Sequence, residues 1–452
     1  MKLNDSALFR QHCYIDGRWT DAKANETIEV TNPATNERLG TVPKLSQDEV
    51  SEAIDAADRA FPLWKAKTAK QRAAILRKWF DLCMEHQEDL AQILTLEQGK
   101  PLQEARGEIA YGASFIEWFG EEAKRVYGDV IPAHANDRRI IVTKEPVGVV
   151  AAITPWNFPN AMITRKAAAA MAAGCSVIVK PASSTPYSAL ALAELAERAG
   201  VPQGVLNVVT GSASVVGGEL TANPLVRKLS FTGSTEVGKI LLSECAKTVK
   251  KVSMELGGNA PFIIFEDADL DQAVAGVMAS KFRNTGQTCV CANRIFVHDK
   301  VYDDFADRLA TAVSAQKVGN GLEEGVALGP LINPAAVEKV EQHIEDAKAK
   351  GASVHLGGQR HALQGNFFQP TILTNVSPDS LLMHDETFGP VAPLLRFSDE
   401  NDVIRQANDT SLGLASYFYT RDVGRVWRVA EALECGIVGI NEGIISSELA
   451  PF

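Results

Sequence analysis

The chain has 452 residues, of which 46% are hydrophobic and 22% are charged, a composition that is ordinary for a globular protein with a substantial core. Its 56 acidic and 45 basic residues give a net charge of −11, which argues against nucleic acid or an anionic membrane as the main partner. No uncharged apolar stretch approaches the roughly 18 residues that cross a bilayer, and the start of the sequence lacks the apolar core of a secretory signal. We therefore expect a cytoplasmic protein.

The seven cysteines lack the spacing of a disulfide framework, so we expect them to be reduced. Only Cys289 and Cys291 lie close together in the sequence. A zinc site would need a second such pair or histidines at ligand spacing, and because neither occurs, no metal site is predicted.

The first third of the chain is predicted to be mainly helical. Residues 46–49 and 68–71 form capping boxes, each followed by apolar residues at helical spacing, and a third helix is expected over 103–125. Residues 131–142 contain a turn signal between β-branched residues, which predicts a β-hairpin that stands apart as an arm.

From residue 147 onward, short apolar runs alternate with helical segments. Strands are predicted at 147–154, 176–180, 205–209 and 228–231, and helices at 164–173 and 186–199. This alternation predicts a doubly wound parallel sheet, which binds ligands at the carboxyl ends of its strands.

A second series of strands and helices follows residue 256 and predicts a second α/β domain. Its segments are 262–265, 270–282, 294–297, 301–317, 334–350 and 402–406.

Two segments indicate a nucleotide site, although the dinucleotide fingerprint G-x-G-x-x-G is absent. Gly233 and Ser234 leave a predicted strand and enter a helix, where backbone amides can approach a phosphate. Lys180 ends another predicted strand and can donate to a ribose hydroxyl or a phosphate. A tight turn and a solvated lysine are the plain alternatives.

Three further residues suggest covalent chemistry. Cys289 lies in a polar, glycine-containing loop whose backbone amides would lower the pKa of the thiol and stabilise an oxyanion. Glu255, at a strand end before two glycines, suits a semi-buried general base. Asn157, between two prolines, suits an oxyanion donor. A buried cysteine, a surface glutamate and an ordinary loop are the alternatives.

The motifs that carry these residues resemble those of the aldehyde dehydrogenase superfamily, and its succinate-semialdehyde dehydrogenases in particular, over nearly the whole chain. They are PWNFP at 155–159, KPAS at 180–183, FTGSTEVG at 231–238, MELGGNAP at 254–261, FRNTGQTCVCANR at 282–294 and ETFGP at 386–390.

The resemblance implies an α/β fold of two doubly wound domains. Residues 1–126 and 147–255 would form a Rossmann-like NAD(P)-binding domain, and 256–440 the catalytic domain. Residues 127–146 would form an oligomerisation hairpin, together with 441–452, in a homodimer or homotetramer.

The resemblance also implies a reaction. Cys289 would add to the aldehyde carbonyl, with the oxyanion held by Asn157 and by the backbone amide of Cys289. Hydride would leave the thiohemiacetal for the nicotinamide, and Glu255 would activate the water that hydrolyses the resulting thioester.

Cofactor-binding residues follow from the same resemblance. They are Thr154, Pro155, Trp156, Lys180, Ser183, Gly233, Ser234, Gly238, Leu256, Glu386 and Phe388. Lys180 would bind the adenine ribose, Gly233 and Ser234 the pyrophosphate, and Glu386 and Phe388 the nicotinamide ribose and ring. Because Ser183 is neutral where relatives that prefer NAD often carry a glutamate, we expect NADP to be preferred and NAD to be possible.

Arg165 and Arg283 resemble the pair that binds the far carboxylate of succinate semialdehyde, since guanidinium groups suit carboxylates. Glutarate semialdehyde is the alternative substrate. Relatives continue beyond Phe452 with a tail that completes the substrate pocket. A nucleotide-binding scaffold with impaired activity is therefore a further alternative, and a thiol hydrolase that uses no nucleotide is another.

Cys291 could form a regulatory disulfide with Cys289 or be a passive neighbour.

Overall fold

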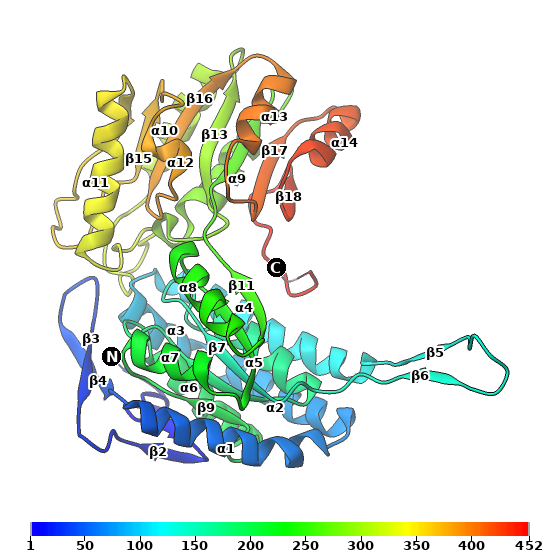
Figure 1. Cartoon of the computed structure of the whole chain (residues 1–452). Coiled ribbons are helices and arrows are strands. Elements are labelled where there is room, and N and C mark those ends of the chain that lie inside the picture. Colours follow the sequence, from blue (N-terminus) through cyan, green and yellow to red (C-terminus); the bar gives the residue numbers. More distant parts are fainter. Residues whose placement is uncertain (1, 451–452) are drawn as a thin grey trace.

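A computed structural model describes residues 2–450 and contains two mixed α/β halves, each built on a seven-stranded sheet (Figure 1). The first sheet has the order β11 (Lys251–Glu255), β10 (Val226–Thr232), β7 (Val149–Ile153), β8 (Ser176–Lys180), β9 (Leu206–Val208), β1 (Cys13–Ile15) and β2 (Arg18–Thr20). The strands from β11 to β9 are parallel, and β1 and β2 are antiparallel additions at the edge.

The second sheet has the order β14 (Ser353–Leu356), β15 (Thr371–Thr374), β16 (Val391–Phe397), β13 (Ala292–His298), β12 (Ala260–Ile264), β17 (Ala415–Tyr419) and β18 (Ile437–Ile440). Only β14 runs antiparallel to its neighbour among these strands. Residues 256–259 connect the two sheets, so the carboxyl end of β11 lies at the junction between the halves.

Helices cover both sheets, as the alternating pattern predicted. In the first half they are α1 (Gln47–Lys65), α2 (Ala69–Glu85), α3 (Gln87–Gln98), α4 (Leu102–Glu122), α5 (Ala161–Ala173), α6 (Tyr187–Ala199), α7 (Ala213–Ala222) and α8 (Thr235–Ala246). In the second half they are α9 (Leu270–Val277), α10 (Tyr302–Ser314), α11 (Pro334–Ala349), α12 (Leu381–His384), α13 (Glu400–Asn408) and α14 (Val423–Ala432). Both predicted capping boxes are present, at the starts of α1 and α2.

The expectation of a mainly helical first third is wrong at its start. Besides β1 and β2, the strands β3 (Thr27–Thr31) and β4 (Arg38–Pro43) form an antiparallel pair before the first long helix. The predicted helix over 270–282 is also two elements, because α9 ends at Val277 and a π-helical turn follows over Met278–Phe282.

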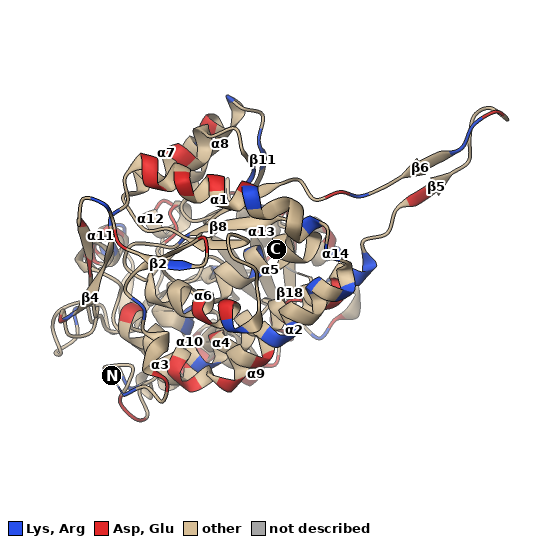
Figure 2. Cartoon of the chain, turned by 90° about the horizontal axis from the view of Figure 1, so that it is seen from below, with Lys and Arg blue, Asp and Glu red and all other residues tan. Residues whose placement is uncertain are grey.

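The predicted hairpin is confirmed. Strands β5 (Asp129–Ile131) and β6 (Ile140–Val142) pair antiparallel and project from the body as a long arm (Figures 1 and 2). Val130 and Ile141 are 81% and 70% exposed, so the arm presents apolar side chains to its surroundings.

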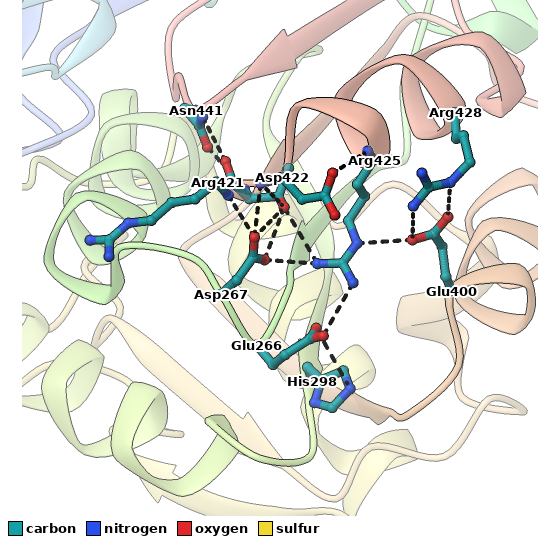
Figure 3. A network of polar contacts seen from close by, with 10 residues as sticks. Glu266, Asp267, His298, Glu400, Arg421, Asp422, Arg425, Arg428 and Asn441 are labelled. Carbon is teal, nitrogen blue, oxygen red and sulfur yellow. Dashed lines mark hydrogen bonds and ion pairs between the residues drawn. The ribbon is translucent and has the colours of Figure 1, made fainter.

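A polar network fastens α14 to the second sheet (Figure 3). The guanidinium of Arg425 lies between three carboxylates, those of Glu266 (3.1 Å), Asp267 (2.8 Å) and Glu400 (2.9 Å), and it stacks over the Phe265 ring at 4.3 Å. Because Arg425 is only 14% exposed at its side chain, these contacts join the end of β12, α13 and α14 away from bulk solvent.

Candidate active site

A cavity of about 370 Å³ opens where the carboxyl ends of the first sheet meet the second half of the molecule. Parallel strands bring their following loops to this one edge, which is why residues distant in sequence meet there. The cavity is lined by Pro155, Trp156, Asn157, Phe158, Met162, Thr232, Gly233, Ser234, Leu256, Gly257, Cys289, Ile332, Asn333, Ala335, Ala336, Lys339, Glu386, Thr387 and Phe388.

Cys289 reaches this cavity from an unusual turn. Asn284 and Thr285 have φ of 51° and 56°, and Gly286 follows at 75°. A side chain at Gly286 would place its Cβ 2.2 Å from the Gly389 carbonyl oxygen, so only glycine fits there. Three successive residues in the left-handed region are costly and are held by their surroundings, and they aim the Cys289 loop at the cavity.

Asn157 is fixed from several directions beside Cys289. Its carbonyl accepts hydrogen bonds from Lys100 Nζ (2.8 Å) and Asn284 Nδ2 (2.9 Å), and its own Nδ2 donates to the Gln287 carbonyl (3.0 Å). The amide that we expected to hold an oxyanion is therefore tied to the Cys289 loop itself.

The expected low pKa of Cys289 is wrong. The pKa of this thiol is raised to about 12, mainly by burial and also by the charges of Glu386 and Glu255, although Arg165 and Arg283 act to lower it. Desolvation of the thiolate thus outweighs the favourable field of the loop and the arginines, so the thiol needs a base to accept its proton.

Glu386 and Phe388, which were predicted to bind the nicotinamide ribose and ring, line the same cavity. Gly258 donates its backbone N–H to Glu386 Oε1 (3.2 Å), and Trp156 meets the Phe388 ring edge-on at 5.5 Å. Burial raises the pKa of Glu386 to about 7, against the opposing effects of the Gly258 N–H, Lys339 and Lys281.

The residues present fit a dinucleotide. Helix α8 begins at the cavity, where Ser234 accepts a hydrogen bond from the Val237 N–H (3.4 Å), and Gly238 approaches Leu256 so closely that a Cβ there would lie 2.4 Å from it. Within residues 2–450, the buried hydroxyls of Thr154 and Thr232 have no hydrogen-bond partner. A helix amino end beside unpartnered hydroxyls suits a phosphate-bearing ligand.

Lys180 is the last residue of β8 and Ser183 follows the strand, and neither lines this cavity. The Lys180 ammonium is 6% exposed and donates to the Pro181 carbonyl (3.1 Å), and burial lowers its pKa.

Glu255 and Arg165 line another cavity, of about 430 Å³, instead of the one with Cys289. Glu255 is half-buried at the end of β11, opposite Thr232. Lys166 shares this cavity, and burial lowers its pKa to about 7. Glu255 raises and Arg165 lowers the pKa of the Cys289 thiol, so all three belong to one electrostatic neighbourhood.

Arg283 lines a third cavity, of about 310 Å³, with Tyr111, Phe158 and Ser446 among its neighbours. Phe158 lines both this cavity and the one with Cys289, so the two spaces adjoin at this residue. The Arg283 guanidinium lies 5.3 Å from the centre of that ring.

Cys291 is buried, and its thiol lies within hydrogen-bonding distance of the carbonyls of Lys281 (3.7 Å) and Ala292 (3.6 Å). Both cysteines are free thiols. Among the residues described, no group of histidines, cysteines and carboxylates could hold a metal ion.

Sequence reasoning missed several residues of these cavities. Lys339 of α11 reaches the cavity of Cys289, and Tyr111 and Ser446 line the cavity of Arg283. Lys100 and Glu108, both 1% exposed at their side chains, form a buried ion pair at 2.6 Å behind Asn157. Lys100 and Glu108 are eight residues apart, which is not the i, i+3 or i, i+4 spacing of an ion pair on a helix, so the sequence does not indicate this pair.

Comparison with known proteins gives consistent matches. The model of the aldehyde dehydrogenase family matches residues 19–452. The succinate-semialdehyde dehydrogenase (NADP(+)) GabD of Escherichia coli (strain K12) is 67% identical, and a glutarate-semialdehyde dehydrogenase of Pseudomonas putida is 66% identical; each match covers 100% of this chain and 94% of the relative. A crystal structure of succinate-semialdehyde dehydrogenase from Burkholderia pseudomallei superposes with a TM-score of 0.99 at 63% identity, covering 100% of this chain and 94% of that one.

Proposed function

The chain belongs to the aldehyde dehydrogenase family, and from that premise we propose that it oxidises succinate semialdehyde to succinate with reduction of NADP. The observation that carries the chemistry is that Cys289 and Asn157 line one cavity with Glu386 and Phe388. The acid-aldehyde substrate is supported by Arg165 and Arg283, two cations close enough to Cys289 to lower the pKa of its thiol.

In this proposal the Cys289 thiol passes its proton through water to Glu255, which then releases it to solvent, and the sulfur adds to the aldehyde carbon. The Asn157 amide and the Cys289 backbone N–H donate to the oxygen that becomes negative, which stabilises the thiohemiacetal anion. When bound, the nicotinamide cofactor supplies the acceptor for the hydride that leaves this carbon. Glu255 then takes a proton from water, which attacks the thioester and releases the acid and the free thiol.

The cofactor would be held along the edge of the first sheet. The α8 amino end with Gly233 and Ser234 would bind the pyrophosphate, and Lys180 the adenine ribose. The neutral side chain of Ser183 and the cation of Lys180 favour the extra phosphate of NADP, and the E. coli relative is named for NADP(+).

The same proposal assigns functions to the parts of the chain. Residues 1–126 and 147–255 would bind the cofactor and 256–440 would carry the catalytic loop. Residues 127–146 would join copies of the chain into a homodimer or homotetramer, with 441–452. Residues 2–450 hold no helix long and apolar enough to cross a membrane, and a cytoplasmic location is part of the proposal.

A panel of aldehydes with NAD and with NADP tests the proposal, with reduced cofactor measured at equal protein concentration and Cys289→Ala as the control. Succinate semialdehyde with NADP should give the highest kcat/KM, and Cys289→Ala should give no turnover while still binding cofactor. A higher kcat/KM for neutral aldehydes would contradict the substrate assignment.

Glutarate semialdehyde is the second candidate, because two of the similar relatives are named glutarate-semialdehyde dehydrogenases. The same panel separates the two acids by their kcat/KM values. Cofactor binding without turnover of any aldehyde would instead support an inactive scaffold.

For Cys291 we propose a regulatory function in which peroxide accepts two electrons as Cys289 and Cys291 join in a disulfide, with release of water. Its thiol would first have to leave the Lys281 carbonyl. Peroxide should inactivate the parent reversibly, with recovery in reductant, and if Cys291→Ala inactivates and recovers in the same way, the proposal is wrong.

A further inference from the structure

The cavity that contains Arg283 holds two unpartnered donors. Within the described part of the chain, neither the Tyr111 hydroxyl nor Arg283 Nε has a hydrogen-bond partner, although both atoms are buried. Both residues line the same space of about 310 Å³. Buried donors without partners cost free energy, so two of them facing one cavity indicate an acceptor that binds between them.

Tyr111 is placed there by its helix. Glu104, Gly107, Glu108 and Tyr111 of α4 all line the cavity, at the i, i+3, i+4 and i+7 spacing of a single helix face. The Tyr111 ring packs edge-on against Phe115, with ring centres 4.8 Å apart.

The same Phe115 ring supports Arg165, whose guanidinium lies 5.0 Å from its centre. Tyr111 therefore stands between the two arginines of the proposed substrate site. Burial raises the pKa of Tyr111, and Arg165 and Arg283 partly offset this, so its hydroxyl keeps its proton at neutral pH and remains a donor.

The carboxylates on this helix face do not compete for the two donors. Glu108 is paired with Lys100 at 2.6 Å and also accepts the backbone N–H of Asn160 (2.9 Å). Glu104 accepts the backbone N–H of Asn284 (2.8 Å), and burial raises its pKa. The Ser446 side chain also lies near Tyr111, but no hydrogen bond of normal geometry joins the two hydroxyls.

We propose that Tyr111 is a specificity-determining residue, whose hydroxyl donates a hydrogen bond to the far carboxylate of the semialdehyde beside Arg283. The inference rests on the proposed function and extends it to a third substrate-binding group. Because Phe158 lines both this cavity and the one with Cys289, the two spaces adjoin, and the proposal places the carboxylate here and the aldehyde end at the thiol.

The test compares Tyr111→Phe with the parent on two aldehydes of equal chain length, succinate semialdehyde and butanal, which lacks the carboxylate. Loss of a hydrogen bond to a charged group should raise KM for succinate semialdehyde about tenfold or more, with little change in kcat. The kinetic constants for butanal should stay unchanged. Succinate as an inhibitor of butanal oxidation should bind correspondingly more weakly to the variant.

A matched control is Tyr187→Phe, because Tyr187 also has a buried hydroxyl without a partner in the described residues but lines none of these cavities. This variant should keep parent kinetics on both aldehydes. An unchanged KM for succinate semialdehyde and unchanged succinate inhibition in Tyr111→Phe, or equal losses on both aldehydes, would overturn the inference. A parent enzyme that prefers butanal would instead overturn the proposed function, and succinate inhibition would still decide whether Tyr111 binds a carboxylate.

Discussion

The carboxyl group of Glu386 is poised to titrate at neutral pH. Burial raises its pKa to about 7, with the Gly258 N–H, Lys339 and Lys281 as the surrounding groups that oppose the shift. Only the ionised carboxylate of Glu386 can accept hydrogen bonds from two hydroxyls of the cofactor ribose. Cofactor binding through Glu386 should therefore strengthen as this carboxyl group loses its proton.

We therefore expect KM for NADP to fall as pH rises from 6 to 8 and to level off above that range. Glu386→Gln should show a higher KM and lose most of this pH dependence. Initial rates at saturating aldehyde, with NADP varied at each pH, measure the effect. A variant with the same pH profile as the parent would show that a group other than Glu386 is responsible.

The site residues show where sequence reasoning reaches its limit. Motifs identified Cys289, Asn157, Glu386 and Phe388, and the structure brings these four to one cavity. The pKa of Cys289 was misjudged because the loop amides are visible in a sequence, whereas the burial that dominates is not.

Contacts across the fold were also invisible in the sequence. Tyr111, in the middle of a helix, meets Ser446 and Arg283 at one cavity only because α4, the chain end and the catalytic loop converge. Glu255 and Arg165 were expected beside Cys289, yet they line a separate space.

Among the helices and strands, the sequence predicted best those whose stabilising contacts lie between residues close together in the chain. Side chains at both capping boxes close hydrogen bonds within four residues, and both helices begin as expected. Strands β1 and β2 are three residues each and pair with each other, and only β1 joins them to the sheet by pairing with distant β9, which leaves little local pattern to detect.

The ion pairs of Arg425 predict how much this side chain contributes to the stability of the fold. Replacing Arg425 by methionine would leave Glu266, Asp267 and Glu400 without their shared cation, and we expect a loss of about 2–4 kcal/mol in the free energy of unfolding. Arg421 forms one exposed ion pair with Asp269, so Arg421→Met should leave stability almost unchanged.

The loss in the free energy of unfolding of Arg425→Met should also depend on pH. Hydrogen bonds from Arg428 and Arg425 lower the pKa of Glu400 below its usual value of 4.5, so its stabilisation is present above that pH and is lost as pH falls through the folded-state value. Urea unfolding at pH 7 and at about pH 4 measures the difference, which should shrink in acid. An equal deficit at both pH values would mean that packing over Phe265, and not charge, carries the effect.

At the scale of the whole molecule, the arm of β5 and β6 is the part that the body does not support. Its Val130 and Ile141 side chains are exposed in one chain, and apolar groups on a projecting hairpin suit burial against a second copy. Replacing both residues by aspartate should lower the mass of the particle in light scattering, because the charges would have to enter the interface.

Val423→Asp on α14 provides the control, since Val423 is 74% exposed and lies on a different element. Its particle mass should equal that of the parent. An arm variant that keeps the parent mass would contradict assembly through the hairpin.

The edge-on contact of Trp156 with Phe388 has a practical consequence for the whole enzyme. An indole in the wall of the cavity of Cys289 is a fluorophore at the place where the dinucleotide is proposed to bind, so the part of the quenching that is absent in Trp156→Phe would report occupancy. Such a titration needs no catalytic turnover, so it would give the dissociation constant of the dinucleotide even for the Cys289→Ala variant.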